Sequence, residues 1–328
     1  MEDDEDEDMF DDLDLSRKPR RPAKEDNQLN IIIVCCEEDP ASMNIRENLI
    51  QKYNFSKQKL SFKNKPIYNK GFIWLITVDK SFLFEDHIDE QIDAELYIFA
   101  SKHQSKEGVP SLTVHCPGNW GIAEHGGVDK EVSMCSASSL KDAFVELNNL
   151  AVEKKLGIQV TLEVTHHGPL MAKRPCFFIE IGSTIDQWVN QELGRAMAEA
   201  IIRICEHLTA KATGKKSSSE YEIALGIGGP HYANNFNKIQ LNSNVAIGHI
   251  CPKYQLGNLD EETLRKAVQM TKEKVNFILA DWKGLGEHKE KIKSIVEKLG
   301  YKLKKTNEID KSQGNDNSDS ESDNSDDY

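Results

Sequence analysis

Several common signatures are missing from this sequence of 328 residues. It has no CxxC pair, and its seven cysteines are odd in number and irregularly spaced, which argues against a disulfide framework and against a ribbon-type zinc site. The HExxH, Walker A and GxSxG motifs are also absent, which removes the common metalloprotease, P-loop and serine-esterase classes. We therefore expect the cysteines to be buried thiols in a reducing compartment.

Membrane and targeting signals are missing as well. No apolar run approaches the ~18 residues that a membrane helix needs, and the N-terminus, Met1-Glu2-Asp3-Asp4, lacks the basic and apolar regions of a secretory signal. We expect the protein in the cytoplasm. The nucleus is an alternative if Lys18, Arg20 and Arg21 form an import patch, although a solvated tail is the simpler interpretation of these residues.

The formal net charge of −13 comes from the two ends of the chain. Residues 1–27 and 308–328 together carry 20 acidic and 6 basic side chains, whereas residues 28–307 carry 34 acidic and 35 basic ones. Such acidic ends cannot bury enough apolar surface to offset their ordering entropy, so we predict disorder over 1–28 and 307–328. Residues 29–306 remain for a single α/β domain, which would carry any catalytic activity. Its near-neutral charge neither indicates nor excludes an RNA substrate.

Strand-like and helical patterns alternate through this central region. Apolar and β-branched runs predict strands at 31–36, 72–78, 95–100, 111–115, 158–164, 176–181, 221–227, 244–248, 275–280 and 301–303. Helical spacing of apolar residues predicts helices at 40–52, 139–155, 186–209, 259–272 and 287–299. We expect a mixed, largely parallel sheet that is covered by helices on both faces.

Histidines gather where predicted strands end. Six of the ten lie at or just beyond such an end: His103, His115, His166, His167, His231 and His249. Parallel strands bring these ends to one edge of a sheet, where open α/β sheets bind ligands. Histidine titrates near neutrality and is the commonest metal ligand, so the cluster suits either general acid-base catalysis or a zinc-activated water. A lone histidine such as His103 or His249 is, however, more often structural.

Three features around the cluster have two interpretations each. His166 and His167 are neighbours on an extended segment, where side chains alternate, so we expect only one of them to enter the site. Glu180 lies in an apolar run and needs a cation, a metal or a histidine as partner, unless it faces solvent. Thr184 and Gln187 have capping-box spacing, and the exposed amides there could also hold an anion, although ordinary capping is the default.

Six short segments of the sequence occur in an order that resembles a known family. They are Ser101-Lys102-His103, Gly118-Asn119-Trp120, Thr165-His166-His167-Gly168-Pro169, Glu180-Ile181-Gly182-Ser183-Thr184, Gly228-Gly229-Pro230-His231-Tyr232, and Gly248-His249 followed by Lys253-Tyr254. Each segment is weak alone, but together they resemble the archaeal and plant type of D-aminoacyl-tRNA deacylase over about residues 29–304. His125 has no match in the pattern, and we assign it no role.

The resemblance implies an esterase that removes a D-amino acid from the 3′ end of a mischarged tRNA, with zinc as a cofactor. It also implies a fold related to peptidyl-tRNA hydrolases and nucleoside phosphorylases. We expect a monomer that acts on aminoacyl-tRNA. The alternatives are a hydrolase of peptidyl-tRNA or N-modified aminoacyl-tRNA, and a tRNA-binding protein without catalytic activity.

Together, the resemblance and the histidine pattern suggest roles for individual residues. The expected catalytic residues are His103, His166, His167 and His231, and the expected metal ligands are His115, Glu180 and His249. The expected substrate contacts are Lys102, Asn119, Trp120, Gly182, Ser183, Thr184, Tyr232 and Lys253. Among these, Lys102 and Lys253, with the loop at 211–216, are candidates for contact with tRNA phosphates.

Overall fold

The computed structural model describes residues 29–215 and 220–309. The prediction of a disordered N-terminal segment, and nearly all of the prediction for the C-terminal tail, concern residues outside these ranges. The described chain continues past residue 306 as a helical turn over 306–309, in which Ile309 is buried.

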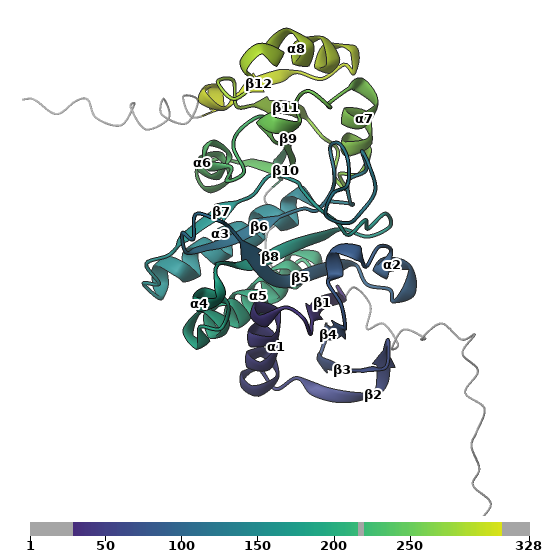
Figure 1. Ribbon diagram of the computed structural model, residues 1–328, viewed down its shortest axis with the longest axis vertical. Coiled ribbons are helices and arrows are strands. Elements are labelled where there is room, and N and C mark those ends of the chain that lie inside the picture. Colours follow the sequence, from purple (N-terminus) through teal and green to yellow (C-terminus); the bar gives the residue numbers. More distant parts are fainter. Residues whose placement is uncertain (1–28, 216–219, 310–328) are drawn as a thin grey trace, which may run out of the picture.

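A large sheet of eight strands forms the centre of the molecule (Figure 1). In spatial order its strands are β2 (Ser56–Phe62), β3 (Lys65–Lys70), β4 (Ile73–Val78), β1 (Ile31–Cys36), β5 (Leu96–Gln104), β8 (Cys176–Ser183), β6 (Ser111–His115) and β7 (Gln159–Leu162). The strands from β4 to β8 are parallel in this order, and β6 is parallel to β7, but β6 runs antiparallel to β8. β2 and β3 form an antiparallel hairpin that pairs with β4.

A second, smaller sheet lies beyond β7 (Figure 1). Its order is β10 (Val245–Cys251), β9 (Glu222–Ile227), β11 (Phe277–Ala280) and β12 (Leu303–Lys305), and all its pairings are parallel. The two sheets are joined where the backbone N–H of Val164 donates to His231 and that of Thr165 donates to Ile250, at 3.1 and 2.9 Å. The predicted mixed, largely parallel α/β fold is confirmed, although the strands divide between two sheets.

Helices cover the sheets unevenly. The helices are α1 (Pro40–Lys52), α2 (Ile88–Gln91), α3 (Ala137–Glu153), α4 (Ile185–Trp188), α5 (Gln191–Ala212), α6 (Asn234–Asn242), α7 (Glu261–Gln269) and α8 (Lys289–Lys298), with short 3-10 turns η1 (Phe82–Phe84), η2 (Lys253–Gln255) and η3 (Gly286–His288). α1, α3 and α5 pack together against one face of the large sheet and enclose the main core. The opposite face is covered by the segment around η1 and α2.

The boundaries of several elements differ from the prediction. The helix that we expected over 186–209 is two helices, because Asn190 starts a new one by accepting hydrogen bonds from the backbone N–H groups of Glu192 and Leu193. The hairpin of β2 and β3 and helix α6 were not predicted, since their sequences are dominated by polar side chains. β5 and β10 are longer than expected, so His103 and His249 lie inside strands.

The cysteines follow the prediction except for one pair. Cys116 and Cys135 form a disulfide, with their Cα atoms 6.1 Å apart, so the expectation of thiols throughout is wrong here. The chain between them folds back on itself, which their spacing in the sequence cannot reveal. The other five cysteines are free and buried, as expected. Within the described residues, no helix is long and apolar enough to cross a membrane.

Candidate active site

One row of polar side chains crosses the large sheet. Ser101 on β5, Glu180 on β8 and Thr113 on β6 are directly paired in register, which places their side chains on the same face. The Ser101 hydroxyl donates to one oxygen of Glu180, and the Thr113 hydroxyl donates to the other at 3.2 Å. Burial and the nearby Glu163 raise the pKa of Glu180 to about 8. Glu180 is 3% exposed, so the alternative of a solvent-facing carboxylate is wrong.

Glu163, which the sequence analysis did not single out, lies at the centre of the histidine cluster. Its carboxylate is 2.9 Å from Nδ1 of His103, 2.9 Å from Nε2 of His231 and 3.4 Å from Nε2 of His166. Burial opposes ionisation of Glu163, but its contacts with His103 and His231 hold its pKa well below the usual value. Burial likewise disfavours the charged forms of His103 and His231. The contacts with Glu163 outweigh this effect and raise the pKa of both histidines.

The ring of His103 is held on both sides. Its Nδ1 faces Glu163, and its Nε2 lies 2.9 Å from the hydroxyl of Tyr232, which is 3.1 Å from the hydroxyl of Ser111. Gly182 makes room for this ring, because a Cβ there would lie 2.8 Å from Cδ2 of His103 and 2.9 Å from the Ser111 hydroxyl. His103 is therefore fixed in position.

His166 and His167 both enter the site, contrary to the expectation that only one would. The expectation assumed an extended segment, but His167 has φ +47°, a left-handed conformation that cancels the alternation of side chains. Nδ1 of His166 is 2.8 Å from the carbonyl oxygen of Val164, and Nδ1 of His167 is 2.6 Å from that of Gly168. A carbonyl oxygen can only accept, so Nδ1–H is the donor in both rings. Both neutral rings therefore present the lone pair of Nε2 to the cluster.

His115 completes a group of three imidazoles. Its Nε2 is 3.2 Å from Nε2 of His167, and its ring stacks on that of His166 with centroids 4.4 Å apart. Burial, together with the neighbouring histidines, lowers the pKa of His115 and His166 well below the usual value, and burial lowers that of His167 to about 4. The three rings are thus held neutral.

This group fits a metal ion. One ligand atom from each of His115, His166 and His167 lies within 4.8 Å of the others, and neutral imidazole is the form that binds metals. Metal-bound histidines commonly donate their other N–H to a carbonyl, as His166 and His167 do here. Two further groups have ligand atoms that all lie within 4.8 Å of one another and could also hold a metal ion. They are His103 with Glu163 and His231, and His115 with Glu163 and Glu180.

The side chains do not meet by the route that the sequence suggested. We expected parallel strands to bring their carboxyl ends to one edge, but β6 and β7 run opposite to β5 and β8. His103 and His115 therefore come from strands of opposite direction and meet across Glu180, which is 3.8 Å from Nδ1 of His103 and 3.9 Å from Nδ1 of His115. The site lies over the face of the sheet.

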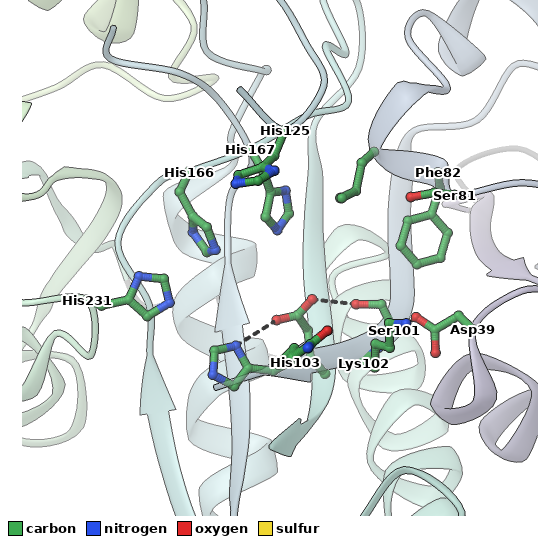
Figure 2. Close-up of a pocket in the computed structure, with 13 residues that line it drawn as sticks. Asp39, Ser81, Phe82, Ser101, Lys102, His103, His125, His166, His167 and His231 are labelled. Atoms are coloured by element: carbon green, nitrogen blue, oxygen red, sulfur yellow. Dashed lines mark hydrogen bonds and ion pairs between the residues drawn. The ribbon is translucent and has the colours of Figure 1, made fainter. Parts of the chain in front are cut away.

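Two cavities meet at the histidines. The first, which we call the sheet lobe, has a volume of about 300 Å³ and is lined by Asp39, Ser81, Phe82, Leu83, Ser101, Lys102, His103, Gln104, His125, His166, His167, Glu180 and His231. Figure 2 shows the histidines along one wall, with Asp39 and Phe82 on the opposite wall. The second, the loop lobe, has a volume of about 260 Å³ and is lined by Gly118, Asn119, Trp120, Ile122, Glu124, His125, Thr165, His166, His167, His231, Pro252, Tyr254 and Gln255.

Four of the expected substrate contacts lie in or beside these lobes. Lys102 lines the sheet lobe, with its Nζ over the ring of Trp188 at 5.1 Å from the centroid. Asn119 and Trp120 line the loop lobe, and the Asn119 amide donates to the carbonyl of Gly126 at 2.9 Å. Tyr232 reaches the site through His103. Lys253 is exposed beside Tyr254 but does not line either lobe.

Four further predicted residues line neither lobe and are held by local contacts instead. His249 is buried inside β10, where its Nδ1 is 3.3 Å from the Thr165 hydroxyl, and it belongs to none of the candidate metal groups of the described chain. Gly182, Ser183 and Thr184 are occupied locally: Ser183 donates to the carbonyl of Val109, and Thr184 forms the predicted capping box with Gln187. Ordinary capping therefore explains the helix start better than an anion site does.

Other residues of the site were missed by sequence reasoning. Glu163 lies in an apolar run, Leu162-Glu163-Val164, so the argument that singled out Glu180 applies to it equally. His125, to which we assigned no role, lines both lobes. Asp39 was predicted only as a helix start; it does cap α1, and its second oxygen accepts from the backbone N–H of Lys102 at 2.9 Å.

The chain is similar to known proteins in both sequence and fold. A family model described as D-aminoacyl-tRNA deacylase matches residues 90–304. The D-aminoacyl-tRNA deacylase of Thermococcus kodakarensis is 38% identical over 279 residues, which cover 83% of this chain and 98% of the relative. That of Methanosarcina barkeri is 34% identical over 314 residues, which cover 90% and 98%. A crystal structure of a conserved protein of unknown function has a TM-score of 0.77 at 30% identity, covering 86% of this chain and 97% of that one.

Proposed function

This chain belongs to the D-aminoacyl-tRNA deacylase family, and on that premise we propose that its two-lobed pocket hydrolyses the ester of D-aminoacyl-tRNA. The products are free tRNA and a D-amino acid. The observation that carries the assignment to this pocket is the position of Glu163. This buried carboxylate holds His231 at the wall that both lobes share, where the ester carbonyl of a bound substrate would lie.

His231 is the general base of the proposed reaction. Its Nε2 faces Glu163 at 2.9 Å, so in the neutral ring Nδ1 carries the lone pair that accepts a proton from water. The His231 side chain is 39% exposed, so water can reach the ring. A carboxylate behind a histidine fixes the tautomer and stabilises the imidazolium that forms, as in other esterase sites.

The proposed hydrolysis proceeds through a tetrahedral intermediate. Water adds to the ester carbonyl carbon as its proton moves to Nδ1 of His231, which gives a tetrahedral intermediate with a negative oxygen. The intermediate then expels the ribose oxygen of the terminal adenosine, and the imidazolium returns the proton to that oxygen. The bond between the acyl carbon and the ribose oxygen is broken. The water oxygen remains in the carboxyl group of the amino acid, which releases the second water proton to solvent as it ionises. A base in this position typically contributes about 10² to 10⁴-fold in rate.

Zinc fits the neutral group of His115, His166 and His167. A zinc ion held there would act as a Lewis acid that polarises the ester carbonyl. This division of roles moves His166 and His167 from the expected catalytic set to the metal ligands, because their pKa values are lowered and their Nδ1 atoms donate to carbonyls. Glu180 and His103 then act as positioning residues that keep Glu163 and His115 in place.

The experiment that tests this function compares D-Tyr-tRNA with N-acetyl-Tyr-tRNA as substrates of the purified full-length protein. D-Tyr-tRNA should be hydrolysed faster than N-acetyl-Tyr-tRNA, and His231→Ala should lower kcat/KM on D-Tyr-tRNA by about 10² to 10⁴-fold. Faster hydrolysis of the N-acetyl substrate would indicate a peptidyl-tRNA hydrolase instead. Wild-type rates in His231→Ala would remove this histidine from the mechanism.

Three further expectations belong to the same proposal. Lys102 and Lys253 contact tRNA phosphates. Residues 29–306 act as one catalytic unit. The protein works as a monomer, either in the cytoplasm alone or also in the nucleus. Light scattering of the purified protein at working concentration tests the monomer, and a stable dimer would contradict it. The relation of the fold to peptidyl-tRNA hydrolases and nucleoside phosphorylases stays a prediction.

A further inference from the structure

The two lobes are separate cavities that share one wall. His125, His166, His167 and His231 line both of them, and every other lining residue belongs to one lobe alone. An ester has an acyl part and an alcohol part on either side of the bond that breaks. If that bond lies at the shared histidines, as in the function proposed above, then the aminoacyl group and the terminal nucleoside occupy opposite lobes.

The loop lobe has the side chains that a nucleobase requires. Tyr254 and Ile122 are among the most exposed large apolar side chains of the described chain, at 55% and 73%, and both line this lobe. They come from different segments, one following β10 and the other from the glycine-rich loop after β6. Bases of single-stranded RNA ends bind by stacking on exposed aromatic rings. An exposed tyrosine and isoleucine in the lining of one cavity are thus suited to contact a base.

Gln255 adds a polar group beside the aromatic ring. Its Oε1 accepts a hydrogen bond from the amide of Asn258 at 2.8 Å, which leaves the Nε2 hydrogens as donors. Adenine has ring nitrogens that accept such bonds, and Gln–adenine pairing is a common form of base recognition. Gly121 brings the loop up to this residue, because a Cβ at position 121 would lie 2.8 Å from Oε1 of Gln255.

The sheet lobe is different in character. Its lining includes none of the exposed large apolar side chains of the described chain, and its Phe82 is buried. The sheet lobe therefore has no exposed phenylalanine, tyrosine or tryptophan ring on which a base could stack. The loop lobe instead opens beside Lys253 and Tyr254, both exposed, where the tRNA chain could continue into solvent.

We propose that the loop lobe binds the 3′-terminal adenosine of tRNA, with its base stacked on Tyr254, and that the aminoacyl group enters the sheet lobe. Tyr254 and Gln255 are thus the residues that recognise the adenine end of the substrate. This inference rests on the proposed ester hydrolysis, but its test does not need turnover.

The test is the binding of AMP to the purified full-length protein, followed by ligand-observed NMR. Wild type should bind AMP, and Tyr254→Ala should weaken that binding by about 5- to 150-fold, the loss expected for one base stack. Tyr254→Phe keeps the ring and should bind within about twofold of wild type. The matched control is Phe84→Ala, because Phe84 is an exposed aromatic residue, at 67%, that lines neither lobe; this variant should bind as wild type does.

Three outcomes would overturn the assignment. They are no AMP binding to wild type, equal affinity in wild type and Tyr254→Ala, and a loss that instead follows Phe82→Ala in the sheet lobe. Hydrolysis of D-Tyr-tRNA on the same preparations separates this inference from the function. AMP binding that depends on Tyr254 without any hydrolysis would contradict the proposed function alone, whereas an unchanged kcat/KM on D-Tyr-tRNA in Tyr254→Ala would contradict the subsite alone.

Discussion

Glu163 shows how a single residue can organise a cluster of histidines. Three histidines surround its buried carboxylate, and two of them approach it at 2.9 Å. An isolated buried carboxylate is costly, so the contacts with His103 and His231 stabilise the ionised form that burial would otherwise disfavour. The same contacts raise the pKa of His103 and His231. The cluster therefore contains two kinds of histidine. His103 and His231, which contact the carboxylate at 2.9 Å, have raised pKa values, whereas His115, His166 and His167 have lowered ones.

The first prediction concerns Glu163→Gln. This change keeps the size of the side chain but removes the charge that orients His231, so kcat/KM on D-Tyr-tRNA should fall by about 10² to 10⁴-fold. The control is Glu131→Gln, since Glu131 pairs with Lys266 and lines neither lobe. A Glu163→Gln enzyme with wild-type kinetics would show that Glu163 does not support the base.

The second prediction concerns Gly182→Ala. The added methyl group would lie 2.8 Å from the ring of His103, which Glu163 and Tyr232 hold from two sides and which cannot move aside freely. We expect a loss of about 1–3 kcal/mol in the free energy of unfolding, together with a reduced kcat. Gly257→Ala is the matched control, because a Cβ at Gly257 meets nothing within 4 Å. Denaturant unfolding checks the stability, and equal losses in the two variants would refute the packing argument.

At the scale of elements, the site depends on how strands and helices are joined. α4 ends at Trp188, whose indole N–H donates to the backbone carbonyl of His103 at 2.9 Å. Asn44 on α1 in turn donates to the carbonyls of Trp188 and Asn190 at 2.9 and 2.8 Å. The break between α4 and α5 thus links the end of β5 to α1 through hydrogen bonds.

The third prediction tests this break. Asn190→Ala removes the side chain that caps α5, so the free energy of unfolding should fall by about 0.5–2 kcal/mol. Asn190→Asp keeps a capping oxygen and should retain most of the stability. Thermal unfolding followed by circular dichroism measures both variants. If Asn190→Ala were as stable as wild type, the cap would not be what starts α5.

The elements themselves were largely predictable, whereas their partners were not. Buried strands such as Ile31–Cys36 have continuous apolar runs, and Asp39 with Pro40 marks the start of α1 in the sequence. β2 is mostly exposed and β3 is mostly half-buried, and both strands are dominated by polar residues, so the hairpin has no apolar alternation to detect. The antiparallel pairing of β6 with β8 depends on tertiary packing, and it is what brings His115 to Glu180.

The site was partly predictable for the same reasons. Histidines at strand ends and the carboxylate of Glu180 are visible as chemical types in unusual places. The left-handed conformation of His167 is not, because nothing in a pair of histidines indicates which backbone angle the second will adopt. His249 satisfied the same pattern as the others, yet it lies inside β10, since the strand extends three residues beyond the predicted end.

For the whole molecule, the site lies where the two sheets meet. The large sheet contributes His103, His115 and Glu180, and the segment that follows β7 carries Glu163, His166 and His167 toward the small sheet (Figure 1). His231, Tyr232 and Tyr254 come from connections within the small sheet. Neither sheet alone would hold the two-lobed pocket, so the proposed reaction requires both parts of the fold in place.

The fourth prediction concerns the metal. If His115, His166 and His167 hold zinc, the purified protein should contain at least one zinc ion per chain, as measured by mass spectrometry of the metal. Chelation should abolish hydrolysis of D-Tyr-tRNA, and added zinc should restore it. His115→Ala should lower the zinc content, whereas His288→Ala, outside both lobes, should not. Full activity in metal-free protein would contradict the zinc site.

The most direct test of the central claim is the ratio of hydrolysis rates on D-Tyr-tRNA and L-Tyr-tRNA, measured in single-turnover reactions with the full-length protein. A D-aminoacyl-tRNA deacylase should release D-tyrosine much faster than L-tyrosine, and Glu163→Gln should slow the D reaction toward the rate without enzyme. Equal rates on the two enantiomers, or no hydrolysis of either, would contradict the assignment.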